Sequence, residues 1–200
     1  PGGLFVGDAG ARLWPPRFRV GDDRRRVGVV RTTFAHRFGG RLYVGLQNNE
    51  WRLSWDLAVL TGDPRADATP PPVRIRVTPD GGRMTRRFAS GGGRLYWIAG
   101  LPRPRAAELW VSADGVWFRP LGLPPDAGVP QDLVIADDVR WLLASGGLYR
   151  AGPDDVFVRV AAAPPSDPFG RWDTFCSAPL AVVADQLLAG STRDGALWRA

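Results

Sequence analysis

The sequence predicts an all-β protein, a β-propeller of about five four-stranded blades whose first and last blades are incomplete. Three observations lead to this fold: poor helix-forming content, abundant aromatic residues, and a strand-turn-strand pattern that recurs along the chain. The 25 glycines and 19 prolines make up more than a fifth of the 200 residues, and lysine is absent. Nine tryptophans and nine phenylalanines argue against disorder, because disordered chains are poor in aromatic residues. Many short strands joined by turns fit this composition.

An aromatic marker sets the period of the repeat. Five segments share an apolar strand, a glycine-containing turn and a second strand with a Leu-Trp or Leu-Tyr pair or a close relative. The marker recurs at intervals of 41, 55, 39 and 49 residues, from Trp14 through Trp55, Trp110 and Tyr149 to Trp198. A period of about 40 to 50 residues made of strands and turns is typical of propeller blades.

The first two segments pair residues 4–7 with 13–14 and residues 42–45 with 53–55. Residues 33–38 precede the second pair and are predicted to form an innermost strand that faces the central channel. Because residues 3–7 match the second strand of a blade, the first blade is predicted to lack its innermost strand.

The next two segments show the blade pattern most clearly. From the innermost strand outward, strands are predicted over 87–90, 94–99, 108–112 and 116–121, and then over 132–136, 139–144, 147–151 and 156–160. The second strand of each blade is an almost continuous apolar run, as expected for a strand that neighbouring blades cover on both faces.

The last segment stops one strand short. Leu197-Trp-Arg-Ala200 aligns with Leu148-Tyr-Arg-Ala151, after which the earlier blade still has residues 156–160. Two interpretations stay open. The blades close as an irregular five-bladed ring within a single domain of residues 1–200, or the chain is a piece of a larger propeller. In the second case a partner must cover the exposed strand edges.

Two turns carry a hydroxyl, an aspartate, a glycine and an aromatic residue in close succession, and residues 78–82 form a weaker third example. They comprise Ser112, Asp114, Gly115 and Trp117, and Thr192, Asp194 and Gly195 with Trp198. These turns resemble the Asp-box of BNR-repeat propellers, which include sialidase-type and photosystem-assembly-type proteins. In such a box the hydroxyl and carboxylate accept turn N–H groups, glycine takes a positive φ, and the aromatic ring pins the turn to the sheet. The resemblance implies a structural role for these residues.

Two arginine runs are the strongest surface signals. The net charge is +6, and arginine supplies all of the strongly basic residues, as in a GC-rich bacterial genome. The predicted surface for an anionic partner consists of Arg24, Arg25, Arg26, Arg83, Arg86 and Arg87. Such runs fit phosphates or an acidic protein, while a solvated face is the plainer interpretation.

The sequence gives little support to a catalytic set. Tyr43, Tyr96 and Tyr149 each lie within an apolar strand, where core packing explains them. Glu50 and Glu108 precede tryptophans. As paired carboxylates they fit glycoside hydrolysis, and as isolated residues they cap strand ends in solvent.

Other isolated groups have simple explanations. The single histidine, His36, excludes a multi-histidine metal site and fits a hydrogen-bonded structural role, and the single cysteine, Cys176, fits a small buried hydrophobe. The acidic pairs at 22–23, 137–138 and 154–155 are turn-like and lack the alternating ligand spacing of a calcium loop.

We therefore expect a non-enzymatic interaction or scaffold module that binds a protein partner or completes a larger assembly, with no cofactor. One alternative is a glycan-binding or glycan-hydrolysing protein similar to sialidases. A second is nucleic-acid binding through the arginine-rich surface. The sequence has no run of about 18 apolar residues and no signal-peptide pattern, so we expect no membrane span, and the compartment stays open.

Overall fold

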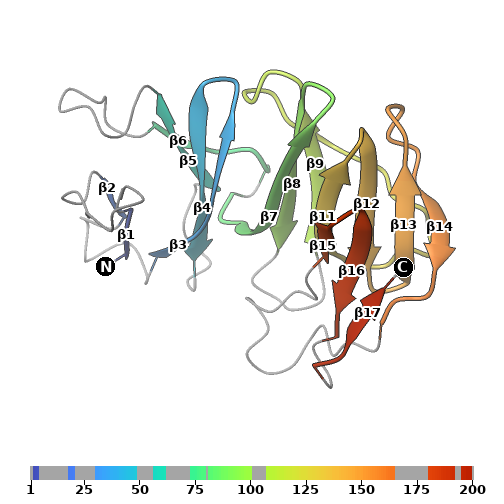
Figure 1. The fold of residues 1–200 in the computed structure, drawn as a ribbon. Coiled ribbons are helices and arrows are strands. Elements are labelled where there is room, and N and C mark those ends of the chain that lie inside the picture. Colours follow the sequence, from blue (N-terminus) through green and yellow to red (C-terminus); the bar gives the residue numbers. More distant parts are fainter. Residues whose placement is uncertain are drawn as a thin grey trace. The chain divides into compact units, whose positions relative to one another are not determined.

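The computed structural model describes residues 2–4, 18–20, 30–48, 56–61, 73–79, 81–100, 107–164, 180–191 and 195–199. Every regular element in these ranges is a β-strand (Figure 1). A search of the same ranges for a helix long and apolar enough to cross a membrane finds none. The chain divides into two compact units, Pro1–Thr85 and Arg86–Ala200, which we describe separately. A single domain over the whole chain stays a prediction.

The first unit contains two antiparallel sheets. β1 (Gly2–Leu4) pairs with β2 (Phe18–Val20). A second sheet follows chain order through β3 (Val30–Phe38), β4 (Arg41–Asn48), β5 (Leu57–Thr61) and β6 (Val73–Ile75). The predicted strand at 53–55 lies outside the described residues, and the strand that pairs with β4 is β5. The predicted innermost strand at 33–38 falls within β3, the edge strand of this sheet.

Three further sheets follow, also in chain order. The first comprises β7 (Met84–Gly91), β8 (Arg94–Gly100), β9 (Ala107–Ser112) and β10 (Arg119–Pro120). The second comprises β11 (Pro130–Ala136), β12 (Val139–Ala144), β13 (Gly147–Ala151) and β14 (Val158–Ala161). The third comprises β15 (Leu180–Val183), β16 (Gln186–Gly190) and β17 (Leu197–Arg199).

Four sheets, those that begin with β3, β7, β11 and β15, share the same first turn. In each of them the first two strands are joined through two residues of positive φ. The turn residues are Gly39 and Gly40, Gly92 and Gly93, Asp137 and Asp138, and Ala184 and Asp185. Two successive positive φ angles define a type I′ turn, whose twist matches the right-handed twist of the flanking strands. This turn therefore recurs once in each of these four sheets and marks the repeat in the backbone.

Hydrophobic cores fill the spaces between successive sheets of the second unit. Tyr96, Ile98 and Leu109 of the β7–β10 sheet pack against Leu142 and Tyr149 of the β11–β14 sheet. On the other face of the β11–β14 sheet, residues of β11, β12 and β13 pack against β15 and β16, namely Val134, Trp141, Leu143 and Leu148 against Leu180, Leu187 and Ala189. A middle sheet buried on both faces is the packing expected of successive propeller blades.

Candidate functional site

The first strands of the three sheets in the second unit meet at Asp132. Its Oδ1 lies 3.1 Å from Arg87 Nε on β7 and accepts the Leu133 backbone N–H, while its Oδ2 accepts the Leu180 N–H of β15 at 2.7 Å. Burial raises the pKa of the Asp132 carboxyl, against the opposing influence of Arg87 and the two backbone donors. These contacts connect β7, β11 and β15, so the Asp132 carboxylate joins three successive sheets.

A second buried polar cluster fixes the loop before β14. Tyr96 Oη donates to Asp155 Oδ1 at 2.6 Å, and Arg140 Nε donates to Tyr96 Oη at 3.0 Å and lies 3.4 Å from Asp155 Oδ1. Arg94 also donates from Nη1 to Asp155, and the negative charge of Asp155, together with this hydrogen bond, raises the pKa of Arg94. Asp155 has a φ of 60° in the tight turn between β13 and β14. The cluster therefore anchors this turn to β8 and β12 and sets where β14 begins.

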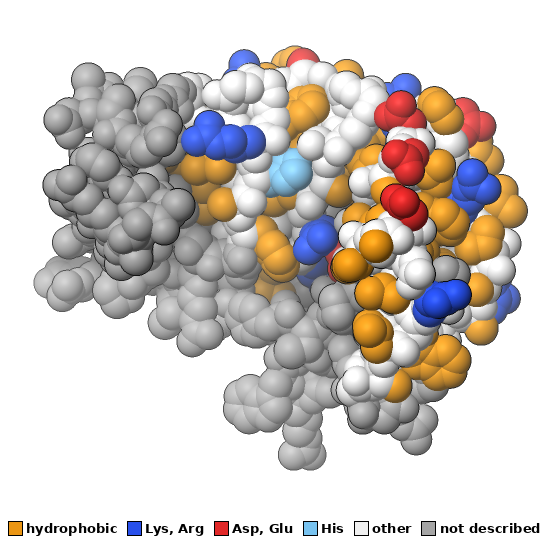
Figure 2. All heavy atoms as spheres, viewed as in Figure 1, with side chains coloured by type: hydrophobic (Ala, Val, Ile, Leu, Met, Phe, Trp, Pro, Cys, Tyr) orange, Lys and Arg blue, Asp and Glu red, His pale blue; other side chains and the backbone are white. Residues whose placement is uncertain are grey.

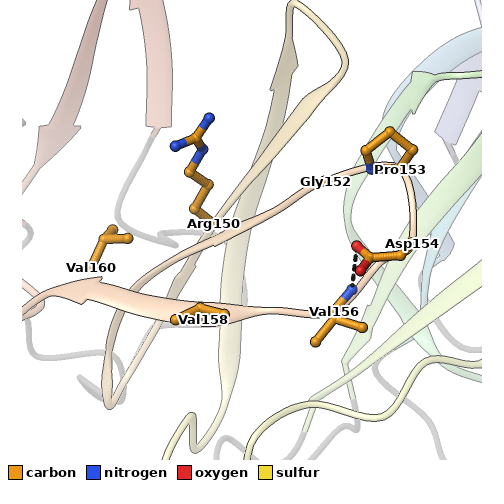
Figure 3. Close-up of a pocket in the computed structure, with 7 residues that line it drawn as sticks. All are labelled: Arg150, Gly152, Pro153, Asp154, Val156, Val158 and Val160. Atoms are coloured by element: carbon orange, nitrogen blue, oxygen red, sulfur yellow. Dashed lines mark hydrogen bonds between the residues drawn. The ribbon is translucent and has the colours of Figure 1, made fainter.

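β14 and the turn before it line an apolar pocket of about 730 Å³ (Figure 3). Its walls are formed by Arg150, Gly152, Pro153, Asp154, Val156, Val158 and Val160. Asp154 Oδ1 accepts the Val156 N–H at 3.2 Å, the dashed bond in Figure 3. Val156 belongs to the turn before β14, while Val158 and Val160 belong to the strand, and all three valines line this pocket as an apolar row.

All four residues of β14 are exposed, and the buried residue of this segment is Phe157, which precedes the strand. Val156, Val158 and Val160 are 62%, 61% and 50% exposed, whereas Phe157 between them is 5% exposed and belongs to the core against the preceding sheet. β17 is also exposed: Leu197 and Trp198 are 68% and 48% exposed, whereas Leu148 and Tyr149 at the matching positions of β13 are buried. Figure 2 shows exposed hydrophobic side chains over this side of the molecule, where Figure 1 places β13, β14 and β17.

A second, smaller pocket of about 350 Å³ lies at the turn between β9 and β10. It is lined by Arg94, Val111, Ser112, Ala113, Trp117, Phe118 and Arg119. The side chain of Trp117 is 81% exposed. An indole this exposed in a pocket that Arg119 also lines offers a flat apolar surface and a positive charge, which suits a ligand with an apolar face and an anionic group.

Side-chain hydrogen bonds from Ser112 and Asp114 hold the turn at residues 112–117. Ser112 Oγ accepts the Gly115 N–H at 2.8 Å, and Asp114 Oδ1 accepts the N–H groups of Val116 and Trp117 at 2.8 and 2.9 Å. These backbone donors lower the pKa of Asp114, and Gly115 has a φ of 71°. Trp117 was expected to pack against the sheet, but its side chain is exposed. Phe118 packs there instead, edge-on against Trp97 with ring centroids 6.2 Å apart.

The other predicted turns are described in part. Gly195 has a φ of 71°, whereas Thr192 and Asp194 lie outside the described residues. At the weaker third box, Gly81 donates its N–H to Thr78 Oγ1, and the carboxylate that holds Thr78 is that of the buried Asp56.

The predicted arginine surface needs a correction. Arg83 and Arg86 are buried, and only Arg87 of this run is partly exposed, where it contacts Asp132. Arg86 fits inside because Gly100 has no side chain: a Cβ there would lie 2.8 Å from Arg86 Nε. Arg24, Arg25 and Arg26 lie outside the described residues. The described part of the run therefore does not form the continuous basic surface that nucleic-acid binding requires.

The remaining candidate residues are dispersed. Tyr43, Tyr96 and Tyr149 are buried, as the strand pattern predicts. Glu108 is exposed and accepts the Trp110 indole N–H at 3.2 Å, and His36 is partly buried on β3. Glu50 and Cys176 lie outside the described residues. Within the described ranges, no group of three or more His, Cys, Asp or Glu residues is placed to hold a metal ion.

Comparisons with known proteins show the fold. No protein-family model and no curated protein matches the chain. A luciferin-regenerating enzyme is similar in structure, with a TM-score of 0.54 and 13% identity over 93% of this chain and 62% of that one. A GH32 β-fructofuranosidase of Bombyx mori, and a mutant of it in complex with sucrose, give TM-scores of 0.44 and 0.45 at 15% and 14% identity, over 84% of this chain and 43% of theirs.

The similarity to the luciferin-regenerating enzyme supports a β-propeller-like fold, and the predicted fold class is confirmed. The sheets in the described residues agree with about five blades, of which the last shows three strands. The chain spans 62% of the length of that similar structure. At 13% identity the likeness concerns the fold alone.

Proposed function

We propose that this protein is a propeller-type interaction module that binds a protein partner through the apolar pocket beside β14. The observation that supports the proposal is the row formed by Val156, Val158 and Val160, each at least half exposed beside a pocket of about 730 Å³. Contiguous exposed apolar surface costs solubility and commonly marks a protein interaction site. Arg150 at the edge of the pocket supplies the polar rim that such interfaces have.

A photocrosslinking amino acid at position 158 tests this function in the cells that produce the protein naturally. We expect one defined protein adduct when the crosslinker replaces Val158. Val183, a valine of similar exposure on β15, is the matched control position. Equal labelling from both positions, or no adduct from position 158, would exclude the pocket as a protein-binding site.

A second candidate function is glycan binding at the smaller pocket. It is supported by Trp117, which is exposed and lines this pocket together with Arg94 and Arg119. A tryptophan ring packs against the apolar face of a sugar, while arginine pairs with a carboxylate. Binding to an array of acidic oligosaccharides that disappears in Trp117→Ala would support it, and no binding at millimolar ligand would dismiss it. We also propose that the turn at residues 112–117 is an Asp-box of a BNR-type propeller, supported by its hydrogen bonds.

A further inference from the structure

We propose that the smaller pocket binds an acidic sugar through its carboxylate, and that Arg94 couples this site to the larger, apolar pocket beside β14. The coupling is positive: the bound sugar steadies the wall of the larger pocket and so strengthens binding of the protein partner there. The inference rests on the proposed function and specifies how that binding is regulated. Such coupling requires a residue that belongs to both sites, and Arg94 is that residue.

Arg94, the first residue of β8, contacts both pockets. Its side chain lines the smaller pocket together with Trp117. Its Nη1 donates to the Pro153 carbonyl oxygen at 3.2 Å and to the Asp155 carboxylate. Pro153 is a wall residue of the larger pocket, and Asp155 directly precedes Val156, another wall residue. One guanidinium group therefore connects the sugar site to the partner site.

The guanidinium of Arg94 has the geometry to hold both neighbours at once. Its hydrogen bonds to Pro153 and Asp155 both use Nη1, so the edge formed by Nε and Nη2 can hold a ligand carboxylate through two parallel bonds. The ligand then binds without displacing Asp155. Because the Arg94 side chain is 36% exposed, a second set of bonds orders it and makes its bonds to the turn more persistent.

Charge also favours an anion at this position. Arg94 and Arg140 share the carboxylate of Asp155, which balances only one of them, and Arg119 adds a positive charge to the wall of the smaller pocket. The acidic residue of the turn beside this pocket, Asp114, is not a wall residue, and its Oδ1 accepts backbone N–H groups. An incoming carboxylate therefore meets an excess of positive charge.

The turn between β13 and β14 is the element that responds to the ligand. Gly152, Pro153 and Asp154 line the larger pocket (Figure 3). The Asp155 N–H donates to the Gly152 carbonyl oxygen at 3.1 Å, and the Val156 N–H donates to Asp154. The φ of 60° at Asp155 costs energy in a residue other than glycine. Contacts to the Asp155 side chain therefore help to hold the turn closed.

The test uses the whole chain with D-glucuronate as the probe and D-glucose as the matched neutral sugar. In NMR spectra the indole N–H of Trp117 reports sugar binding, and hydrogen exchange of the Asp155 and Val156 amides reports the state of the turn. We expect millimolar glucuronate to shift the Trp117 signal and to slow exchange of both amides roughly threefold, as for one partly exposed ion pair. Glucose, and sodium chloride at the same ionic strength, should do neither.

Two arginine variants separate binding from coupling. Arg119→Gln should weaken glucuronate binding and leave the exchange of the turn amides without sugar unchanged, because the bonds to the turn come from Arg94. Arg94→Lys keeps the charge but lacks the second edge of the guanidinium, so the turn amides should no longer respond to glucuronate. Thermal melts check that each variant folds, and the comparison of glucuronate with glucose on the wild type needs neither variant.

Four results would overturn the inference or the proposed function. Glucuronate binding with unchanged exchange of the turn amides overturns the coupling, and faster exchange overturns its positive sign. Absence of glucuronate binding overturns the assignment of the ligand. If position 158 gives its protein adduct while the turn amides do not respond, the proposed function survives and the coupling fails. If the amides respond and no adduct forms, the coupling stands and the proposed function fails.

Discussion

Tyr96 on β8 donates a 2.6 Å hydrogen bond to Asp155 in the turn before β14, so one sheet holds the loop that positions the outer strand of the next. Both side chains are buried, and Arg140 completes the cluster from β12. The apolar segment 156–160 depends on this contact for its position, because Val156 directly follows Asp155.

Removing this contact should destabilise the protein. Asp155→Ala leaves the buried Arg140 without its carboxylate and should cost about 3 to 5 kcal/mol of unfolding free energy, whereas Tyr96→Phe should cost about 1 to 3 kcal/mol. Urea unfolding followed by tryptophan fluorescence measures both. Asp137→Asn, in an exposed turn where Asn tolerates positive φ, is the control and should change stability by less than about 0.5 kcal/mol. An effect of Asp155→Ala no larger than this control would contradict the role of the cluster.

Gly146 is predicted to be intolerant of any side chain. A Cβ at this position would lie 1.9 Å from the Asp126 carbonyl oxygen, so Gly146→Ala must displace the connection between β10 and β11. Gly122→Ala is the matched control, since nothing lies within 4 Å of its Cβ position. We expect Gly146→Ala to lower the melting temperature clearly and Gly122→Ala to leave it almost unchanged. Equal melting temperatures would show that the close approach is absent.

Acid should open the turn at residues 112–117. The N–H groups of Trp117 and Val116 lower the pKa of Asp114, so its contribution to the folded turn is complete above the ordinary value of 3.8 and is lost as pH falls through the lowered pKa. The amide NMR shifts of Val116 and Trp117 should therefore titrate together with a midpoint below 3.8. A midpoint at or above that value would refute the assignment, and Asp114→Asn should remove the transition.

Asp132 should give the opposite pH dependence. Because burial raises its pKa in the folded state, the carboxyl adds most to the free energy of unfolding at low pH. That contribution declines as pH rises from the ordinary value of 3.8 through the raised pKa. Denaturant unfolding of the wild type and Asp132→Asn across this range should show a stability difference that shrinks with increasing pH. A difference that grows with pH would mean that Arg87 and the backbone donors outweigh burial.

The strands of the central blades could be predicted closely from the sequence. Predicted strands at 139–144 and 147–151 coincide with β12 and β13, because apolar runs bounded by two-residue turns define both ends. β10 and β14 are shorter than predicted, since the hydrogen bonds of Asp114 and Asp154 use Val116, Trp117 and Val156 in turns. Side-chain hydrogen bonds in the preceding turns therefore determine where β10 and β14 begin, and strand propensity alone does not predict these boundaries.

The candidate site could not be predicted in the same way. Val156 to Val160 has the sequence of a strand covered on both faces, and its exposure depends on the surrounding fold rather than on its own residues. Asp155 and Tyr96 are far apart in sequence, so no local pattern joins them. The arginines at 83 and 86 have the sequence pattern of a surface run. Their burial could not be predicted locally, because Gly100, which makes room for Arg86, lies on another strand.

Crosslinking from position 158 is the most direct test of the account. Val158 lies on β14, lines the apolar pocket and is 61% exposed. A photocrosslinking amino acid at this position should give one defined protein adduct, and the same amino acid in place of Val183 should not. Equal labelling from both positions, or no adduct from position 158, would contradict the proposal that this pocket binds a protein.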